Sequence, residues 1–94
     1  MTDEPVHIPI GPELDLHTFA PAEVASVVDE YVRAAAQAGM VTVRLVHGRG
    51  RGVQRGIVQA RLDAHPLVRE FWDDPNAHLG ATIAALGASG PKAP

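Results

Sequence analysis

The sequence predicts an α/β domain, a two-layer βαβαββ sandwich in which two helices cover a mixed four-stranded sheet. Two observations carry this prediction. A clear helical pattern that begins at Pro21 separates two short strand patterns, at residues 13–17 and 41–46. A second helical pattern is then followed by two more strand patterns. Because only two helices are available, we expect both on the same face of the sheet.

Length and composition favour one globular domain. Ninety-four residues allow a modest hydrophobic core but no second lobe. The chain is 46% hydrophobic and 20% charged, which is ordinary for globular proteins and not for disordered ones. Prolines and glycines cluster near the ends. We therefore divide the chain into a flexible N-terminal arm (1–12), the domain (13–87) and a flexible C-terminal tail (88–94).

Several classes of protein are excluded by what the chain lacks. It has no cysteine, which removes disulfides, thiolate metal sites and cysteine nucleophiles. Its first residues are acidic where a signal peptide would be basic, and no apolar run approaches the ~18–20 residues of a membrane span. We therefore expect a cytoplasmic protein with no membrane partner.

The first helix is the most regular element of the sequence. Pro21 suits a first helical position, and Gly39 suits the position just past the end of a helix. Ala20 precedes the helix and offers no side-chain oxygen to cap it, although Glu23 suits the positive end. Apolar residues recur at helical spacing and form the expected inward face, namely Val24, Val27, Val28, Tyr31, Val32 and Ala35.

The second strand, at residues 41–46, is apolar almost throughout and is expected at the centre of the sheet. A strand, a helix and a strand in this order form a right-handed unit with parallel strands. The glycine-rich loop at residues 47–52 therefore opens at the same sheet edge as His17, where open α/β sheets bind ligands. The remaining expected elements are a helix from about Val53 to Ala64, a strand from Leu67 to Trp72 and a strand from Gly80 to Leu86.

Three short motifs occur in a fixed order along the chain. They are Leu14-Asp15-Leu16-His17, His47-Gly48-Arg49-Gly50 and Gly80-Ala81-Thr82. Together they resemble the small MutS-related (Smr) domain over roughly residues 13–87, and most closely its small stand-alone bacterial members. The resemblance implies a βαβαββ fold similar to the C-terminal domain of translation initiation factor three. It also implies RNA or DNA as the partner, because the family includes DNA-nicking enzymes and RNA endonucleases, some of which act at stalled ribosomes.

The predicted catalytic residues are Asp15, His17 and His47. The period-2 alternation of the first strand puts Asp15 and His17 on one face, where the carboxylate can orient the imidazole. Such a histidine can act as general base or acid on a 2′-hydroxyl or a water molecule. His47 would supply a second imidazole for leaving-group protonation. The alternative is structural: Asp15 and His17 would bond loop amides, and His47 would bond the backbone at a strand end.

The glycine-rich loop is the predicted phosphate site, because glycines let the backbone approach an anion and a helix N-terminus follows. No acidic residue lies between Glu30 and Asp63, whereas six arginines do, so a local positive field is expected despite a net charge of −3. The alternative is a turn with solvated arginines. The predicted nucleic-acid-binding residues are Gly48, Arg49, Gly50, Arg51, Gly52, Arg55, His78, Gly80 and Thr82.

The chain departs from the family pattern at three places. Two glycines usually precede the Gly-Ala-Thr motif, but this chain has Ala77-His78-Leu79, where Ala77 would restrict the backbone and His78 would offer a side-chain contact. Arg49 stands in place of a lysine and keeps its charge. Gln54 stands where leucine is usual, so we expect looser docking of the second helix.

Two aromatic residues and two further histidines have predicted positions. Phe71 and Trp72 are adjacent on a predicted strand, so one is expected in the core and the other exposed. With so few aromatic residues, an extended stacking platform is excluded, which implies weak sequence preference. His7 and His65 lie outside the motifs and are expected at the surface. No histidine–carboxylate spacing specifies a metal, so no cofactor is assigned and a divalent cation remains open.

The sequence therefore predicts an Smr-like endonuclease that acts on RNA or on structured or branched DNA. A second interpretation is a non-catalytic nucleic-acid-binding or adaptor module of the same fold, which the net acidity and the altered Ala77-His78 segment favour. A third is a protein-interaction domain. Oligomeric state, the choice of RNA or DNA, and association with ribosomes are left open by the sequence.

Overall fold

Six elements follow one another as predicted in a computed structural model, which describes residues 11–48 and 52–87. The first strand ends two residues earlier than expected, because the backbone turns after Asp15. The expected arm and tail fall largely outside the described residues. In chain order the elements are β1 (Glu13–Asp15), α1 (Pro21–Gln37), β2 (Thr42–Val46), α2 (Val53–Ala64), β3 (Val68–Asp73) and β4 (Ala81–Leu86).

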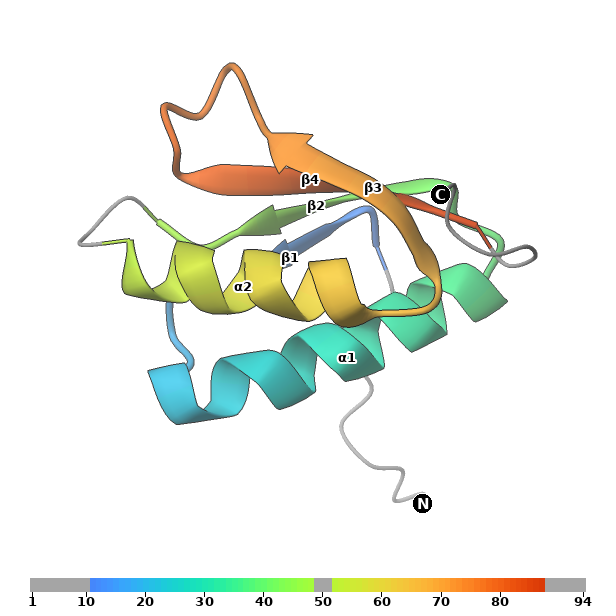
Figure 1. Cartoon of the computed structure of the whole chain (residues 1–94), viewed down its shortest axis with the longest axis horizontal. Coiled ribbons are helices and arrows are strands. Elements are labelled where there is room, and N and C mark those ends of the chain that lie inside the picture. Colours follow the sequence, from blue (N-terminus) through green and yellow to red (C-terminus); the bar gives the residue numbers. More distant parts are fainter. Residues whose placement is uncertain (1–10, 49–51, 88–94) are drawn as a thin grey trace, which may run out of the picture.

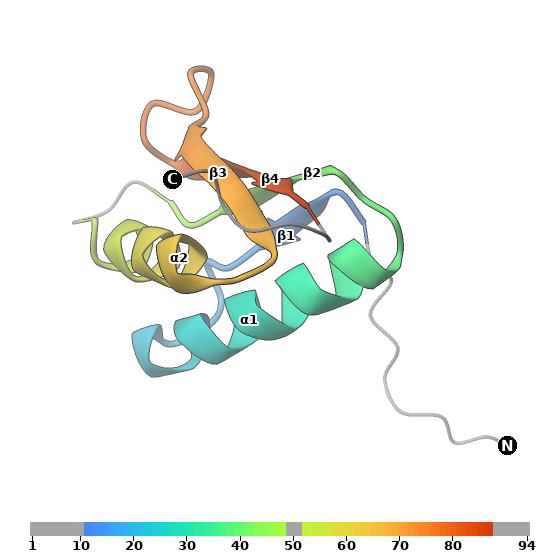
Figure 2. The same ribbon diagram turned by 45° about the vertical axis from the view of Figure 1, so that its right-hand side comes forward.

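The four strands form one mixed sheet in the order β1-β2-β4-β3. The strands β1 and β2 are parallel, and β4 runs antiparallel to both of its neighbours. It follows that β1, β2 and β3 all point the same way, and their carboxyl ends meet the start of β4 at one edge. Both helices lie on the same face of this sheet (Figure 1; Figure 2), which confirms the predicted two-layer arrangement.

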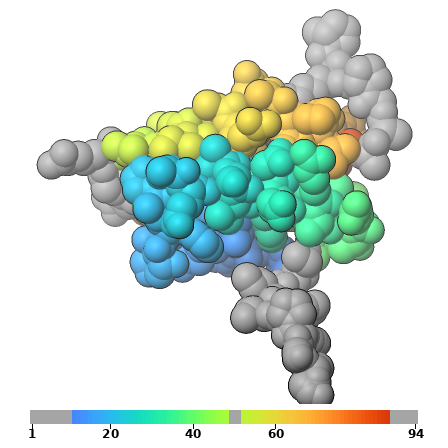
Figure 3. Space-filling model, turned by 90° about the horizontal axis from the view of Figure 1, so that it is seen from below, coloured from blue at the N-terminus to red at the C-terminus, as the bar shows by residue number. Residues whose placement is uncertain are grey.

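The hydrophobic core lies between the sheet and the two helices, which pack side by side across its face (Figure 3). Phe71 packs against this core, whereas Trp72 is 41% exposed, as expected for adjacent residues of a strand. The buried core consists of Leu16, Val24, Val28, Tyr31, Val32, Ala35, Val43, Leu45, Val58, Leu62, Val68, Ala84 and Leu86.

The ends of α1 are set by local hydrogen bonds. At its start the Glu23 carboxylate accepts a hydrogen bond from the backbone nitrogen of Ala20 (3.0 Å), which compensates for the missing capping side chain. At its end Gly39 adopts a left-handed φ of 85°. The backbone nitrogens of Gly39 and Met40 then bond the last helical carbonyls, each at 3.0 Å. Gly39 therefore ends the helix as predicted.

His65 is buried, contrary to the expectation that it lies at the surface. It is 1% exposed and follows the last residue of α2. Its Nδ1 accepts a hydrogen bond from the Leu67 backbone nitrogen (3.1 Å), and its Nε2 lies 3.1 Å from Oδ1 of Asp29 on α1. Burial lowers the pKa of His65, although the Asp29 carboxylate opposes this effect. The local sequence does not reveal this burial, because it depends on the packing of α1 against the end of α2.

Candidate functional site

Four strand ends place polar side chains along the carboxyl edge of the sheet. Asp15 is the last residue of β1, His47 directly follows β2, and Asp73 is the last residue of β3. Thr82 is the second residue of β4, which starts at this edge. The topology therefore brings all three motifs to one edge of the sheet. The sequence analysis expected this of His17 and the glycine-rich loop.

Asp15 and His17 form an exposed pair at the end of β1. Oδ1 of Asp15 lies 2.7 Å from Nδ1 of His17 and also accepts a hydrogen bond from the His17 backbone nitrogen (3.0 Å). These two bonds lower the pKa of Asp15, so its carboxylate is ionised at neutral pH. The side chains are 54% and 67% exposed. Because Nδ1 faces the carboxylate, Nε2 is the ring nitrogen that remains for a reacting group.

His47 is placed differently, because it is only 5% exposed and both of its ring nitrogens have partners. Nδ1 lies 3.1 Å from the Gly48 carbonyl oxygen, and Nε2 lies 2.8 Å from Oγ1 of Thr82. A carbonyl can only accept, so Nδ1 carries the hydrogen and Nε2 of the neutral ring accepts from the threonine hydroxyl. Burial lowers the pKa of His47 and favours this neutral form.

The hydrogen-bond network continues from His47 into α2 and β3. Oγ1 of Thr82 accepts from Nε2 of Gln59 (3.0 Å), which also donates to Oδ1 of Asp73 (3.0 Å). Arg55 holds both oxygens of Asp73, with Nε on Oδ1 and Nη2 on Oδ2, each at 2.8 Å. The Arg55 guanidinium lowers the pKa of Asp73. One network thus links the ends of β2 and β3 with the start of β4.

Sequence reasoning missed Gln59 and Asp73. Arg55 and Gln59 are four residues apart, so the helical period alone places them on one face of α2. That spacing could have marked Gln59. Their partner Asp73 is 18 residues beyond Arg55, and the pairing depends on β3 lying beside α2, which no local pattern reveals.

The described part of the glycine-rich loop has the backbone conformation that glycine favours. Gly48 and Gly52 have left-handed φ values of 83° and 79°. The backbone nitrogens of His47 and Gly48 donate to the Gly80 carbonyl (3.0 and 2.9 Å), which anchors the loop to the start of β4. Gly52 directly precedes α2 and provides no side-chain cap. Three predicted binding residues lie outside the described ranges, namely Arg49, Gly50 and Arg51.

The loop between β3 and β4 projects beyond the sheet (Figure 1; Figure 2) and contains two left-handed residues other than glycine. His78 has a φ of 49° and Leu79 a φ of 70°, and both side chains are exposed. His78 stands where the family resemblance places a glycine, and its left-handed φ gives a physical reason for glycine at that position. The loop closes through a hydrogen bond from the Gly80 nitrogen to the Ala77 carbonyl (2.8 Å).

Gln54, which replaces the leucine usual in the family, has a defined partner. Its Nε2 donates to the Phe19 carbonyl oxygen (2.8 Å). This bond links the first turn of α2 to the segment between β1 and α1. A hydrogen bond thus connects α2 to this segment at the position where looser docking was expected.

The described arginines of the 31–62 segment all lie close to carboxylates, which weakens the positive field expected from these four residues. The segment itself has no acidic residue, but a carboxylate outside it lies within 4.0 Å of each of these arginines, from the preceding turn of α1 for Arg33 and from other elements for the rest. The pairs are Arg33–Asp29, Arg44–Asp74, Arg44–Glu13, Arg55–Asp73 and Arg61–Asp29.

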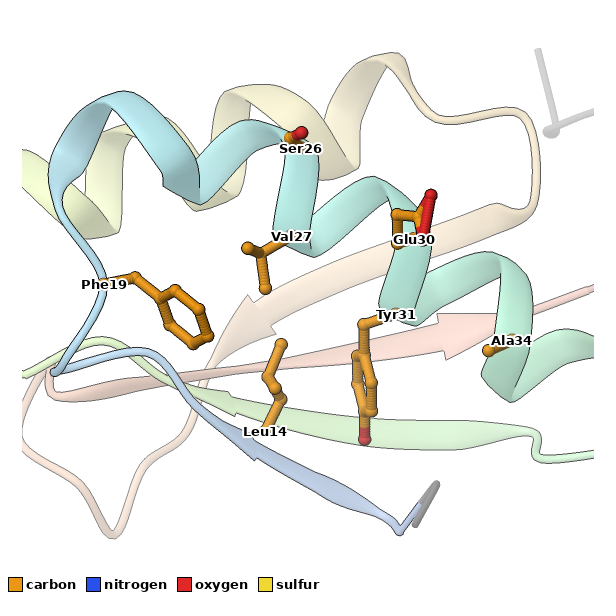
Figure 4. A pocket seen from close by; sticks show the side chains of 7 residues that line it. All are labelled: Leu14, Phe19, Ser26, Val27, Glu30, Tyr31 and Ala34. Carbon is orange, nitrogen blue, oxygen red and sulfur yellow. The ribbon is translucent and has the colours of Figure 1, made fainter. Parts of the chain in front are cut away.

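An open groove of roughly 410 Å³ lies between β1 and α1. Figure 4 shows the side chains of Leu14, Phe19, Val27 and Tyr31 along its walls. Among the described residues, Ser26, Glu30 and Tyr31 are the lining residues with polar side chains, and no basic residue lines the groove. This groove does not suit a phosphate.

Within residues 11–48 and 52–87, no three His, Asp or Glu side chains are grouped as metal ligands would be. No described helix is long and apolar enough to cross a membrane.

Comparison of sequences connects this chain to known proteins. The model of the Smr domain family matches residues 14–86. Proteins named endonuclease MutS2 are similar, including those of Thermomicrobium roseum (36% identity over 80 residues) and Lactococcus lactis (37% over 76 residues). These matches cover 82% and 79% of this chain but 10% of each relative. The chain thus spans about a tenth of the length of these relatives.

Solved structures show the same fold. The crystal structure of the Smr domain of Thermus thermophilus MutS2 has a TM-score of 0.78 and 32% identity, and the match covers 83% of this chain and 100% of that one. YdaL, a stand-alone small MutS-related protein from Escherichia coli, has a TM-score of 0.73 and covers 80% of this chain and 63% of its own. At 24% identity, YdaL supports the fold alone.

Proposed function

This chain belongs to the Smr domain family, and we propose that it is an endonuclease that cleaves RNA or structured or branched DNA with weak sequence preference. The family is one of nucleic-acid nucleases and binding domains, and the similar MutS2 proteins are named endonucleases. The observation that carries the proposal is the exposed Asp15–His17 pair, at the sheet edge where the glycine-rich loop also begins. We place this activity in the cytoplasm.

The proposed chemistry is proton transfer by His17. The Asp15 carboxylate holds Nδ1 of the ring, so Nε2 can take a proton from a 2′-hydroxyl or a water, or give one to the leaving oxygen. Asp15 also stabilises the charged imidazolium that forms when Nε2 takes the proton. A large polymer can reach both side chains because more than half of each is exposed.

Substrate binding is assigned to the loop after β2 and to its surroundings. Gly48 and Gly52 allow close backbone approach, and Arg49, Arg51 and Arg55 supply charge for phosphates. His78 is exposed on the neighbouring loop and offers a side-chain contact. The buried residues of the network act indirectly in this proposal, since they hold the loop in place, and they are His47, Gly80 and Thr82.

The second candidate function is binding without cleavage. It is favoured by the carboxylates beside every described arginine of the 31–62 segment and by His78 in place of a glycine. Either feature weakens the contact with phosphates that cleavage requires. An adaptor of this kind binds nucleic acid in a salt-dependent way and releases no products.

A cleavage assay separates the two candidates. Wild-type protein, His17→Ala and the adjacent exposed control Thr18→Ala are incubated with labelled single-stranded RNA, duplex RNA and branched DNA. We expect the cleavage rate of His17→Ala to be lower than that of wild type by about 100-fold or more, and the rate of Thr18→Ala to equal that of wild type. Equal cleavage by wild-type protein and His17→Ala would assign the activity to a contaminant. Binding by all three proteins without products would favour the adaptor.

A further inference from the structure

The Arg55 guanidinium is already occupied by a carboxylate at the edge where we propose that phosphates bind. Its Nε and Nη2 donate to the two oxygens of Asp73, each at 2.8 Å. A guanidinium binds a phosphate through the same two-pronged geometry. The contact with Asp73 therefore occupies the donor pair that a phosphate would take.

The pair is within reach of a ligand. The Arg55 and Asp73 side chains are 33% and 35% exposed, so the guanidinium is not sealed inside the fold. Asp73 is moreover ionised, because the Arg55 guanidinium lowers its pKa. A phosphate that approaches Arg55 is consequently repelled by the negative charge of Asp73, which is hydrogen-bonded to the same guanidinium.

Asp73 is also fixed on its other side. Its Oδ1 accepts a second hydrogen bond, from Nε2 of Gln59 (3.0 Å), and Gln59 is tied in turn to Thr82. The carboxylate is therefore held in the position that engages Arg55. Its Oδ2, in contrast, accepts from Nη2 of Arg55 and from no other side chain of the described residues.

We infer that Asp73 limits the affinity of this site, because it competes with nucleic-acid phosphates for Arg55. The inference rests on the proposed function, since it requires a nucleic-acid ligand at the carboxyl edge. It assigns a role to a residue that lies outside the three family motifs. Asp73 acts through Arg55 and is thus a residue that sets specificity and affinity, not a catalytic residue.

The decisive variant is Asp73→Asn. The amide oxygen in place of Oδ1 can keep the bonds from Gln59 and from Nε of Arg55. The amide NH2 in place of Oδ2 cannot accept from Nη2, so the variant removes the negative charge and frees this part of the guanidinium without a change in side-chain size. The matched control is Glu70→Gln, which removes the same charge from an exposed residue of the same strand. The double variant Arg55→Gln/Asp73→Asn removes the cation as well.

Binding of fluorescently labelled RNA and branched DNA is measured by anisotropy at about 50 and about 200 mM salt. We expect Asp73→Asn to bind about tenfold more tightly than wild type, which corresponds to about 1.4 kcal/mol. One additional phosphate contact should also steepen the salt dependence by about 0.7–0.9 in logarithmic slope. The double variant should lose both gains, and Glu70→Gln should show neither.

A residue that only supports the fold would give the opposite result, because its loss could weaken binding but not strengthen it. The inference is overturned if folded Asp73→Asn binds no more tightly than Glu70→Gln, or if the gain persists without Arg55. Should Asp73→Asn fail to fold, Asp73→Ser replaces it under the same criteria. If neither wild type nor any variant binds nucleic acid, the proposed function fails together with the inference. If wild type binds and Asp73→Asn gains nothing, the inference alone fails.

Discussion

One carboxylate oxygen of Asp15 holds both the ring and the backbone of His17, at 2.7 Å from Nδ1 and 3.0 Å from the backbone nitrogen. The two residues are only two apart, so the chain must turn directly after β1 for both bonds to form. This turn directs Nε2 of the imidazole away from the carboxylate. The geometry gives the pair a defined direction for proton transfer although it is exposed to solvent.

Replacement of Asp15 by asparagine tests this relationship. The amide oxygen can still accept from His17, but it provides no negative charge to stabilise the imidazolium. We expect Asp15→Asn to reduce the single-turnover cleavage rate by about 10–100-fold, part of the full effect of general acid–base catalysis. Thr18→Ala serves as the neighbouring control. A rate equal to wild type would mean that the carboxylate only shapes the turn.

Acidification should destabilise the protein through His65. Burial lowers the pKa of His65, so the folded state binds its proton less readily than the unfolded state. Its contribution is present above the unfolded pKa of about 6.5 and is lost as pH falls from there through the folded pKa. The free energy of unfolding, from urea titrations between about pH 7.5 and 5.5, should therefore fall. His65→Gln should be less stable at neutral pH but less sensitive to acid, and an unchanged pH dependence would contradict this account.

The loop between β3 and β4 carries a strained residue whose replacement should stabilise the fold. His78 has a φ of 49°, which costs a residue with a Cβ atom roughly 1 kcal/mol. Glycine removes that cost but increases the entropy of the unfolded chain, so we expect His78→Gly to raise the free energy of unfolding by about 0.5 kcal/mol. His78→Ala keeps the Cβ atom and should give no such gain in chemical denaturation.

Core packing predicts a large effect at Leu62 and a small one at Leu79. Leu62 is fully buried between α2 and the rest of the core, whereas Leu79 is exposed. Leu62→Ala should lower the free energy of unfolding by about 2–5 kcal/mol, and Leu79→Ala should change it by about 0.5 kcal/mol or less. Similar losses for both variants would show that Leu79 is covered by something in solution.

The fold could be predicted because its elements carry strong local patterns. The inward face of α1 was evident from the spacing of Val24, Val28 and Val32, and all three are fully buried. Gly39 marked the end of that helix, and the structure gives it the left-handed φ that such an end needs. Short strands with alternating or continuous apolar residues then left few topologies to choose from.

The candidate site could be predicted only in part, because its charges are arranged by tertiary structure. Asp15 and His17 are neighbours in sequence, so their contact was predictable from spacing. Arg55 and Asp73 are far apart in sequence and meet only because α2 packs beside β3. A segment whose sequence contains arginines but no carboxylates can therefore have its described arginines paired with carboxylates in the fold.

The shortness of β1 bears on how the site would be lost. This strand has three residues and, among the described strands, lies at the edge of the sheet and pairs with β2 alone. Elements with so few backbone bonds open locally at a smaller free energy than the central strands do. We therefore expect the amide hydrogens of β1 to exchange faster than those of β4. Cleavage activity should also be lost at a lower denaturant concentration than the one at which the core unfolds. Asp15 and His17, which are proposed to carry out proton transfer, would then be in the first part of the domain to unfold and in the last to regain its structure on refolding.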